Sequence, residues 1–282
     1  MDIFDRDATL TIGTIRIPTR DPVSAEPVPS LRVAFKIVRM TAKNPDSAEV
    51  TIYNLTQTHR SSLQSRDVPC ILSAGYLGNS HQIFSGSLQF SQSVHNGVDW
   101  VTTLKAGDGV TQFKSSRVNV SLRGPVTPQQ ALNAAASALG LPLGNVQQKA
   151  SGTQERASLK QFLNGLVLSG KSELQLDKVC KAFGLRWFVQ DGVVQVLGAA
   201  DVLGSRRVVL SPGTGLVGSP EAGEDGVVKA RSLLLPDLLP GYGVRIESAH
   251  VNGDYRIEKT TFIGDTHGQD WYADIECRQL AA

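Results

Sequence analysis

Alternation of apolar and polar residues along short segments is the feature that most constrains the fold of this chain. In Ala48–Tyr53, every second residue is apolar, which is the period of a half-buried β-strand. The same period recurs in five further segments: Ala8–Ile17, Leu31–Met40, Cys70–Tyr76, Gln82–Ser93 and Val98–Ala106. Between the last two, Asn96-Gly97 predicts a tight hairpin turn. This density of strands predicts a closed or nearly closed antiparallel barrel over residues 1–115.

The segment VTIYNLTQTHRSSL marks the end of one of these strands. After Asn54, Thr56 or Thr58 is placed to cap a short helix through His59 to Ser65. Asn54-Leu55-Thr56 also fits a glycosylation sequon, which matters only in a secreted chain. The first residues, MDIFDRDATLTI, are acidic where a signal peptide is basic, so we do not expect secretion by that route.

The middle of the chain, residues 116–200, changes character and predicts a small α/β domain. Thr127 and Pro128 are typical of a helix start, and Gly140 is typical of its end. A second helix is expected from a cap at Ser172 through Phe183, followed by a hairpin that turns at Asp191-Gly192. The polar interval from Gly144 to Glu155 is interpreted as a loop.

The strand pattern returns in residues 201–282, which predict a second barrel domain. Asn252-Gly253 suggests another hairpin turn. The last segment places Trp271, Ala273, Ile275 and Cys277 on one strand face and Tyr272, Asp274, Glu276 and Arg278 on the other. The predicted fold class is therefore mainly β with an α/β insert, in which two β-barrel domains flank a small α/β domain.

Composition excludes several functional classes. The net charge is +2, and Lys and Arg are scattered rather than grouped, so the footprint of a nucleic-acid-binding protein is absent. The sequence has no apolar run of the roughly 18 residues that a membrane span needs. The three cysteines, Cys70, Cys180 and Cys277, are far apart and are expected to be buried free thiols, as in a protein of the reducing cytoplasm.

One segment matches a nucleotide-binding motif letter for letter. Gly165–Ser172, GLVLSGKS, fits the phosphate-loop pattern with Lys171 at the lysine position. In a phosphate loop the strand precedes the first glycine, whereas here the strand-like residues fall inside the loop, and no series of βαβ units surrounds it. An NTPase is therefore an alternative that we do not favour.

Other catalytic patterns are weaker still. The five histidines show no metal-ligand spacing, and no nucleophile elbow occurs. Asp265, His267 and Asp270 lie close together as in a cation loop, but the glycine falls at the wrong position, so a polar turn is expected instead. Paired carboxylates of a cell-wall hydrolase are not local in sequence, so this alternative and that of a carbohydrate-binding module stay open. We predict no catalytic residue, no cofactor and no metal.

The order of these features resembles the baseplate hub proteins of contractile-tailed bacteriophages and related prophage tails. The resemblance rests on four passages that together span most of the chain: NPDSAEVTIYNLT from Asn44, SAGYLGNSHQIFSGSL from Ser73, Ser169–Gly192, and LLLPDLLPGYGVRIESAHVNGDYRIEKTTFIGDTHGQDW from Leu233. One departure is Phe262-Ile263 before Gly264-Asp265, where a His is expected.

The resemblance implies a structural protein of the virion tail that is assembled in the host cytoplasm and is not an enzyme. It implies a homotrimer that presents six barrels to a hexameric tail tube and a threefold surface to a trimeric central spike. Other baseplate proteins would be further partners, genomic DNA would pass through without specific binding, and no membrane insertion would occur.

Such a ring should expose strand edges or hairpins that pair on assembly. Two hairpins look analogous in the two β regions, and we predict that both are assembly elements. The suspected residues are Gly86, Leu88, Phe90, Trp100, Val251, Asn252, Gly253 and Tyr255.

Overall fold

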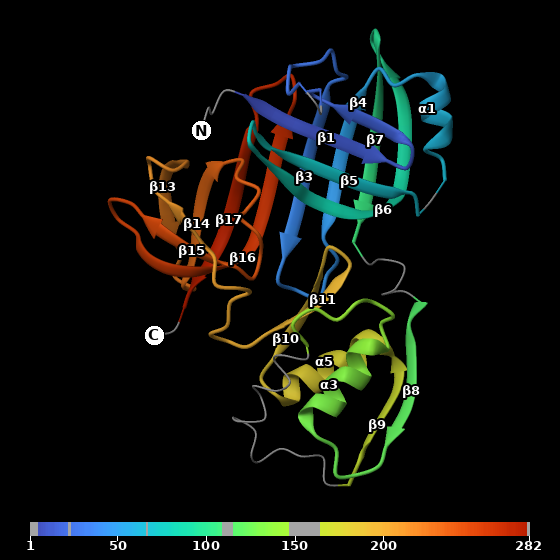
Figure 1. Ribbon diagram of the computed structural model, residues 1–282, viewed down its shortest axis with the longest axis vertical. Helices are drawn as coiled ribbons and strands as arrows, with labels where there is room; N and C mark the ends of the chain where they lie inside the picture. The colour runs from blue at the N-terminus through green and yellow to red at the C-terminus, as the bar shows by residue number, and fades with distance from the viewer. Residues whose placement is uncertain (1–4, 22–23, 66, 109–114, 147–163, 281–282) are drawn as a thin grey trace. The chain divides into compact units, whose positions relative to one another are not determined.

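The computed structural model describes residues 5–21, 24–65, 67–108, 115–146 and 164–280 (Figure 1). The chain divides into two compact units. Unit 1 comprises residues 1–40, 46–108 and 202–282, and unit 2 comprises residues 41–45 and 109–201. The division into domains 1–115, 116–200 and 201–282 stays a prediction.

Unit 1 is one large, mostly antiparallel sheet with a short helix, α1 (Gln57–Ser62). Its strands are β1 (Arg6–Ile12), β2 (Ile15–Pro18), β3 (Val33–Met40), β4 (Ser47–Tyr53), β5 (Pro69–Tyr76), β6 (Asn79–Asn96), β7 (Asp99–Gly107), β12 (Arg207–Leu210), β13 (Leu216–Ala222), β14 (Val227–Leu233), β15 (Gly243–Glu247), β16 (Asn252–Asp265) and β17 (Trp271–Gln279). The predicted alternation is confirmed, for example in β17, where Trp271, Ala273, Ile275 and Cys277 are buried.

The strand order is β13-β14-β17-β16-β3-β4-β7-β6-β5-β1-β2, and β15 pairs with both β16 and β12. The mainly β class is therefore confirmed. The predicted barrels do not close, because the pairings among the described residues form an open path from β13 to β2. The physical reason is that β3 and β16 pair with each other, so each β region continues into the other instead of closing on itself. Figure 1 shows β1, β5 and β6 crossing in front of β3, β4 and β7, and the core fills this fold.

The sheet contains the same pairing order twice. In the first half, β4 pairs with β7, β7 with β6, β6 with β5, and β5 with β1. In the second half, β14, β17, β16, β15 and β12 follow one another in the same way. Both long strands carry a register shift at matching places, between Leu88 and Phe90 in β6 and between Ile257 and Lys259 in β16. One difference is that β12 runs parallel to β15, whereas β1 is antiparallel to β5.

Unit 2 contains the helices α3 (Pro128–Ser137) and α5 (Ser172–Ala182), which pack together, and two two-stranded sheets. The sheets are formed by β8 (Arg117–Leu122) with β9 (Leu166–Lys171), and by β10 (Arg186–Gln190) with β11 (Val193–Leu197). Helix α3 begins as predicted, because Thr127 is its N-cap and forms a capping box with Gln130. At α5, the predicted cap is one residue off, because Lys171 is the N-cap and the Ser172 hydroxyl donates to the carbonyl of Ala138.

Of the three predicted hairpin turns, one is confirmed, one is shifted by a residue and one is wrong. Asp191 and Gly192 both have positive φ, of 52° and 74°, as the β10–β11 hairpin requires. In the β6–β7 hairpin, Asn96 pairs with Asp99, so the two-residue turn is Gly97-Val98 rather than Asn96-Gly97. The Asn252-Gly253 turn is wrong because these residues begin β16, and Ser248 to Val251 form the turn instead. The predicted loop from Gly144 to Glu155 lies outside the described residues from 147 onward.

Candidate functional site

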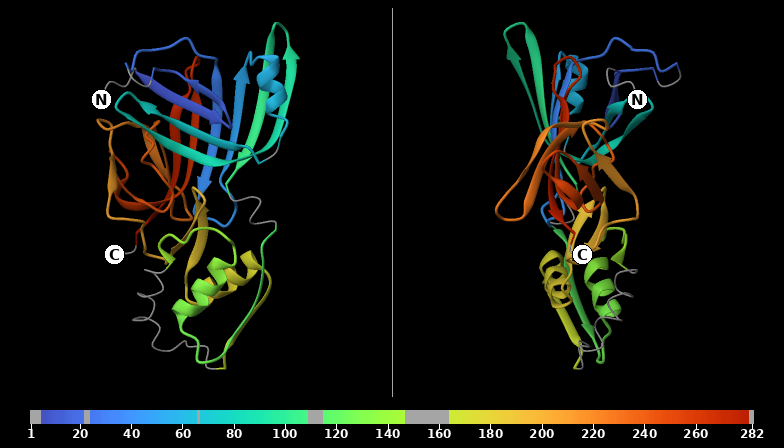
Figure 2. Two further views of the ribbon diagram at one scale, coloured as in Figure 1. Left: turned by 45° about the vertical axis from the view of Figure 1, so that its right-hand side comes forward. Right: turned by 90° about the vertical axis from the view of Figure 1, so that its left-hand side faces the viewer.

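The β6–β7 hairpin exposes several large apolar side chains. The exposed fractions are 47% for Phe90, 46% for Val94, 93% for Val98 and 37% for Trp100. Figure 2 shows the hairpin extending beyond the neighbouring strands of unit 1. We call these four residues the hairpin tip, in which Val98 is in the turn and Phe90 lies beside the register shift of β6. Phe90 and Val94 lie on one face of the hairpin and Trp100, which pairs with His95, lies on the other. Because several large apolar side chains are exposed on one short element, the hairpin tip is a candidate contact surface.

Asn54 connects the turn end of this hairpin to the end of β4. Its backbone adopts φ of 59°, which Asn tolerates better than most residues. Its side-chain amide donates to Asp99 Oδ1 at 2.8 Å, and its Oδ1 accepts from the backbone N–H of Trp100 at 3.0 Å. The Tyr-Asn-Leu segment is thus the place where strand β4 ends, helix α1 follows, and the hairpin is held.

Trp100 is also held by its neighbours. The guanidinium carbon of Arg60, in α1, lies 3.9 Å from the centroid of the indole ring. The His95 ring contacts the indole edge-on, at 5.1 Å between centroids. These contacts fix the Trp100 ring, so a partner would meet a preformed surface.

Replacing Asn54 by alanine is expected to lower the free energy of unfolding by about 1–3 kcal/mol, because two hydrogen bonds are lost and alanine resists the positive φ. Asn54→Gly loses the same hydrogen bonds but accepts the backbone conformation, so its loss should be smaller. Urea unfolding of the two variants measures this order. Equal stability of Asn54→Ala and the unchanged protein would contradict the anchoring role.

The predicted assembly residues of the first hairpin occupy different environments. Phe90 and Trp100 are exposed in the hairpin tip, whereas Leu88 is buried. Gly86 is half-buried, and a Cβ there would come within 2.7 Å of the carbonyl oxygen of Gly107. The structure thus gives Leu88 and Gly86 packing roles, while Phe90 and Trp100 are available to a partner.

The predicted residues of the second hairpin, β15–β16, are more buried than those of the first. Val251 and Tyr255 are buried, Gly253 is half-buried and Asn252 is exposed. Its pairing position matches the β5–β6 hairpin rather than β6–β7, so the two predicted hairpins are not equivalent. The assembly roles of all eight residues stay a prediction.

The first predicted hairpin, residues 86–105, contains Val94 and Val98, but the prediction did not single them out, and sequence reasoning missed Val217 on β13, which is 42% exposed. A signal was present, because residues 68–98 and 208–220 contain no Asp, Glu, Lys or Arg. Uncharged exposed strands are unusual at a sheet edge, where charges normally discourage association.

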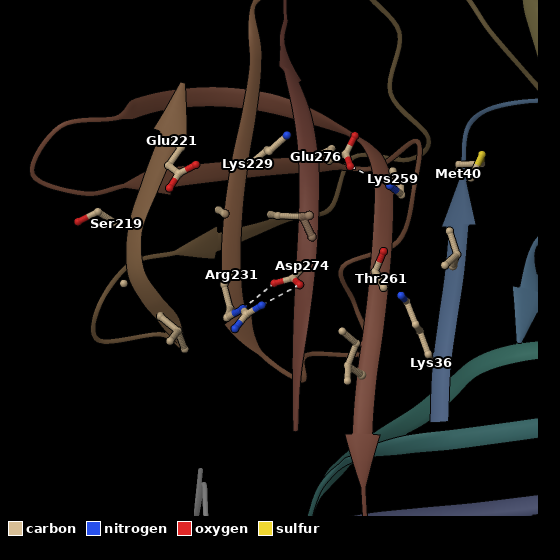
Figure 3. A pocket seen from close by; sticks show the side chains of 16 residues that line it. Lys36, Met40, Ser219, Glu221, Lys229, Arg231, Lys259, Thr261, Asp274 and Glu276 are labelled. Atoms are coloured by element: carbon tan, nitrogen blue, oxygen red, sulfur yellow. Dashed lines mark hydrogen bonds and ion pairs between the residues drawn. The ribbon is translucent and has the colours of Figure 1, made fainter. Parts of the chain in front are cut away.

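The outer face of the second half carries charges of both signs (Figure 3). Arg231 donates to Asp274 through two nitrogens, at 2.7 and 3.0 Å, and Lys259 Nζ lies 2.8 Å from Glu276 Oε1. This outer face also includes Lys229 and Glu221, and it continues onto β3, where Lys36 lies. Opposite charges are interspersed, so this outer face has no strongly basic stripe.

Asp265, which the sequence placed in a possible cation loop, organises a turn instead. Its carboxylate accepts hydrogen bonds from Arg32 and from the backbone N–H groups of His267 and Gly268. Arg6 closes the turn by donating to the carbonyls of Asp265, Gly268 and Gln269. The expectation of a polar turn is therefore confirmed.

The pKa of Asp265 provides a test of this arrangement. Burial of the carboxylate acts to raise its pKa, but the hydrogen bonds from Arg32 and the backbone outweigh burial, and the pKa is lowered. A lowered pKa contributes stability above the unfolded-state pKa of about 3.9 and loses it as the pH falls through the folded-state pKa. We expect Asp265→Asn to cost about 1–3 kcal/mol at neutral pH. The gap between the two proteins should narrow below about pH 4, as measured by chemical unfolding at several pH values; a gap independent of pH would contradict this.

The phosphate-loop match is a strand. Residues 166–171 form β9 and pair with β8, so their backbone is part of a ladder rather than wrapped around an anion. The Ser172 hydroxyl, which would bind magnesium in a phosphate loop, is buried and donates to Ala138. The geometry therefore contradicts the NTPase alternative.

Cys70, Cys180 and Cys277 are buried and free, as predicted, and burial raises the pKa of Cys70 and of Cys180 to about 12.

Within the described ranges, no group of three or more His, Cys, Asp or Glu residues is placed to hold a metal ion. In the same part of the chain, no helix has the length and apolar character of a membrane span.

Comparisons with known proteins agree with this picture. The family model described as "Baseplate hub gp41" matches residues 14–277. The comparison with curated proteins gave no match.

Solved structures show the same fold at low sequence identity. The tail protein from Neisseria meningitidis MC58 has a TM-score of 0.64 at 10% identity, covering 98% of this chain and 96% of its own. The 43 kDa tail protein of prophage MuSo2 from Shewanella oneidensis has a TM-score of 0.62 at 9% identity, covering 98% and 97%. The E. coli c3393 protein, a component of a type VI secretion system, has a TM-score of 0.56 at 10% identity, covering 96% and 77%.

Proposed function

Because the chain belongs to the baseplate hub gp41 family, we propose that it forms a trimeric ring that joins a hexameric tail tube to a trimeric central spike in a contractile phage tail. The family is one of structural tail proteins, and catalysis has no part in this role. The ring acts by matching one symmetry to another.

The repeated strand pairing is the observation that carries this proposal. Each chain supplies two halves with the same order of paired strands, β4-β7-β6-β5-β1 and β14-β17-β16-β15-β12. Three chains therefore offer six similar halves to a sixfold tube, while the differences between halves leave threefold symmetry for the spike.

We assign the wall of the DNA channel to the outer face. Its basic side chains lie beside acidic ones: Arg231–Asp274 and Lys259–Glu276 are ion pairs, and Lys229 is opposite Glu221 and Glu276 in the strand pairing. Unpaired lysines and arginines would hold phosphates and retard passage, so a self-neutralised wall lets DNA slide without specific binding. The hairpin tip faces other protein subunits, including baseplate components.

Light scattering of the purified full chain over a range of concentrations, with electron microscopy of the same sample, tests the ring. The proposal predicts a mass of three chains and particles with a central opening. A chain that stays monomeric at high concentration, or that forms an open filament, would argue against it.

A further inference from the structure

The two halves of unit 1 differ in how one edge of their long strand is used. In β16, residues 259–265 pair with β3. By the matching register shifts, Lys259 corresponds to Phe90, Ile263 to Val94 and Asp265 to Asn96. The corresponding edge of β6, residues 90–96, has no strand beside it among the described residues.

The strand equivalent to β3 in the second half is β13. β3 pairs with β4, and β13 pairs with β14, in matching positions, so that Lys36 corresponds to Glu221. β3 has a second neighbour, β16, whereas β13 is at the end of the described sheet and pairs with β14 alone. Among the described residues, these matching positions therefore leave each chain with two strand edges without a neighbouring strand: residues 90–96 of β6 and the outer edge of β13.

We propose that β6 of one copy lies beside β13 of the next copy, so that the β3–β16 joint within the chain recurs between chains. This inference rests on the ring proposed above and identifies its contact. The correspondence places Val94 opposite Glu221, and Asn96 opposite Val217.

A second copy of this chain fits these edges better than an unrelated partner. The two edges are separated within one molecule by β14, β17, β16, β3, β4 and β7, so they cannot meet in the same chain. A contact between two different surfaces of identical subunits is head-to-tail, and such contacts close into rings when the rotation allows.

The surface chemistry of the two edges also matches. Residues 82–98 contain no charged residue, and Glu221 is the single charged residue of β13. Both edges expose valines, at Val94 and Val98 and at Val217. Pro220 lies in an irregular part of β13 between Val217 and Glu221. Since proline lacks an N–H group, the joint uses the two ends of β13 rather than its centre.

Cysteine cross-linking tests the contact. Chains carrying Asn96→Cys are mixed with size-tagged chains carrying Val217→Cys and exposed to a mild oxidant. The native cysteines are buried, which keeps their background reaction low. The matched control replaces Asn96→Cys by Leu77→Cys, an exposed apolar site at the β5–β6 turn. We expect the first mixture to give a linked pair of unequal chains at roughly tenfold or more above the control, because opposed strand residues bring their Cβ atoms into disulfide range.

The other outcomes separate the two proposals. Linkage of Asn96→Cys chains to one another would overturn the head-to-tail contact in favour of a symmetric hairpin contact. A trimeric mass without the mixed linkage would overturn the contact while leaving the ring intact. A monomeric mass without linkage would overturn both.

Charge insertion provides a second measurement. Val94→Glu, which places two like charges opposite each other at Glu221, and Val217→Lys should each raise the dissociation constant of the assembly by roughly tenfold or more, as expected for a charge placed in an interface. Leu77→Lys should not. Circular dichroism confirms that each variant is folded, and equal effects of all three substitutions would overturn the contact.

Discussion

Replacing Asp46 by alanine is expected to lower the free energy of unfolding by about 3–5 kcal/mol, the largest effect that we predict for a single substitution. Arg39 and Asp46 are 1% and 3% exposed, and Arg39 Nε lies 3.0 Å from Asp46 Oδ2. Asp46 also accepts from the backbone N–H of Met40, and Arg39 donates to the carbonyl of Ile83. The substitution removes a carboxylate from beside a buried guanidinium, and desolvated charges without full compensation are strongly destabilising.

The control is an ion pair of similar geometry at the surface. Asp274→Ala removes the partner of Arg231, whose side chain is about half exposed, so the loss should be within about 1 kcal/mol. Denaturant unfolding of both variants measures the difference. If Asp46→Ala were no more destabilising than Asp274→Ala, burial would not be the reason why the Arg39–Asp46 pair contributes to the free energy of unfolding.

The second large effect is expected for Gly264→Ala, which acts at the joint between the two halves of the sheet. Gly264 of β16 lies opposite Phe35 of β3, and an added Cβ would overlap the Phe35 ring. That ring is buried and packs edge-on against Trp271, at 5.6 Å between centroids, so it has little room to move. Overpacking of this kind costs about 1–3 kcal/mol, and the joint should open at lower denaturant concentration.

Two variants make this prediction specific. Gly213→Ala is the matched control, because its nearest neighbour would be a serine hydroxyl at 3.9 Å. Phe35→Leu added to Gly264→Ala should restore part of the stability, since a smaller side chain leaves space for the Cβ. The cost of truncating Phe35 is measured with Phe35→Leu alone. If adding Phe35→Leu to Gly264→Ala lowers the free energy of unfolding by that same amount, overlap with the Phe35 ring is not the cause of the destabilisation by Gly264→Ala.

Local features of the fold could be predicted from the sequence, because they depend on neighbouring residues. Alternation in Trp271–Cys277 identified the buried face of β17, and Thr127 with Pro128 marked the start of α3. Both signals act over a few residues, through strand period and helix capping. The α5 cap was misplaced by one residue because tertiary contact, the hydrogen bond to Ala138, redirected the Ser172 hydroxyl.

Long-range pairing could not be predicted in the same way. The β3–β16 joint brings together strands that are more than two hundred residues apart in the sequence. The alternation of apolar and polar residues in a strand identifies its buried face but does not identify the strand with which it pairs. The predicted barrels consequently did not close. The candidate contact surface was predicted in part, through Phe90 and Trp100, but the importance of Val94 and Val217 depends on which strand edges remain unpaired, which is a property of the whole sheet.

The measurement that tests the central claim most directly is immunogold electron microscopy of assembled tails, using an antibody raised against the purified chain. The account predicts label at the distal end of the tail tube, where a hub would join the tube to the spike, and loss of that label when the antibody is first absorbed with the purified chain. Well-preserved tails without label at that end, with the chain found in the soluble lysate alone, would contradict a hub function.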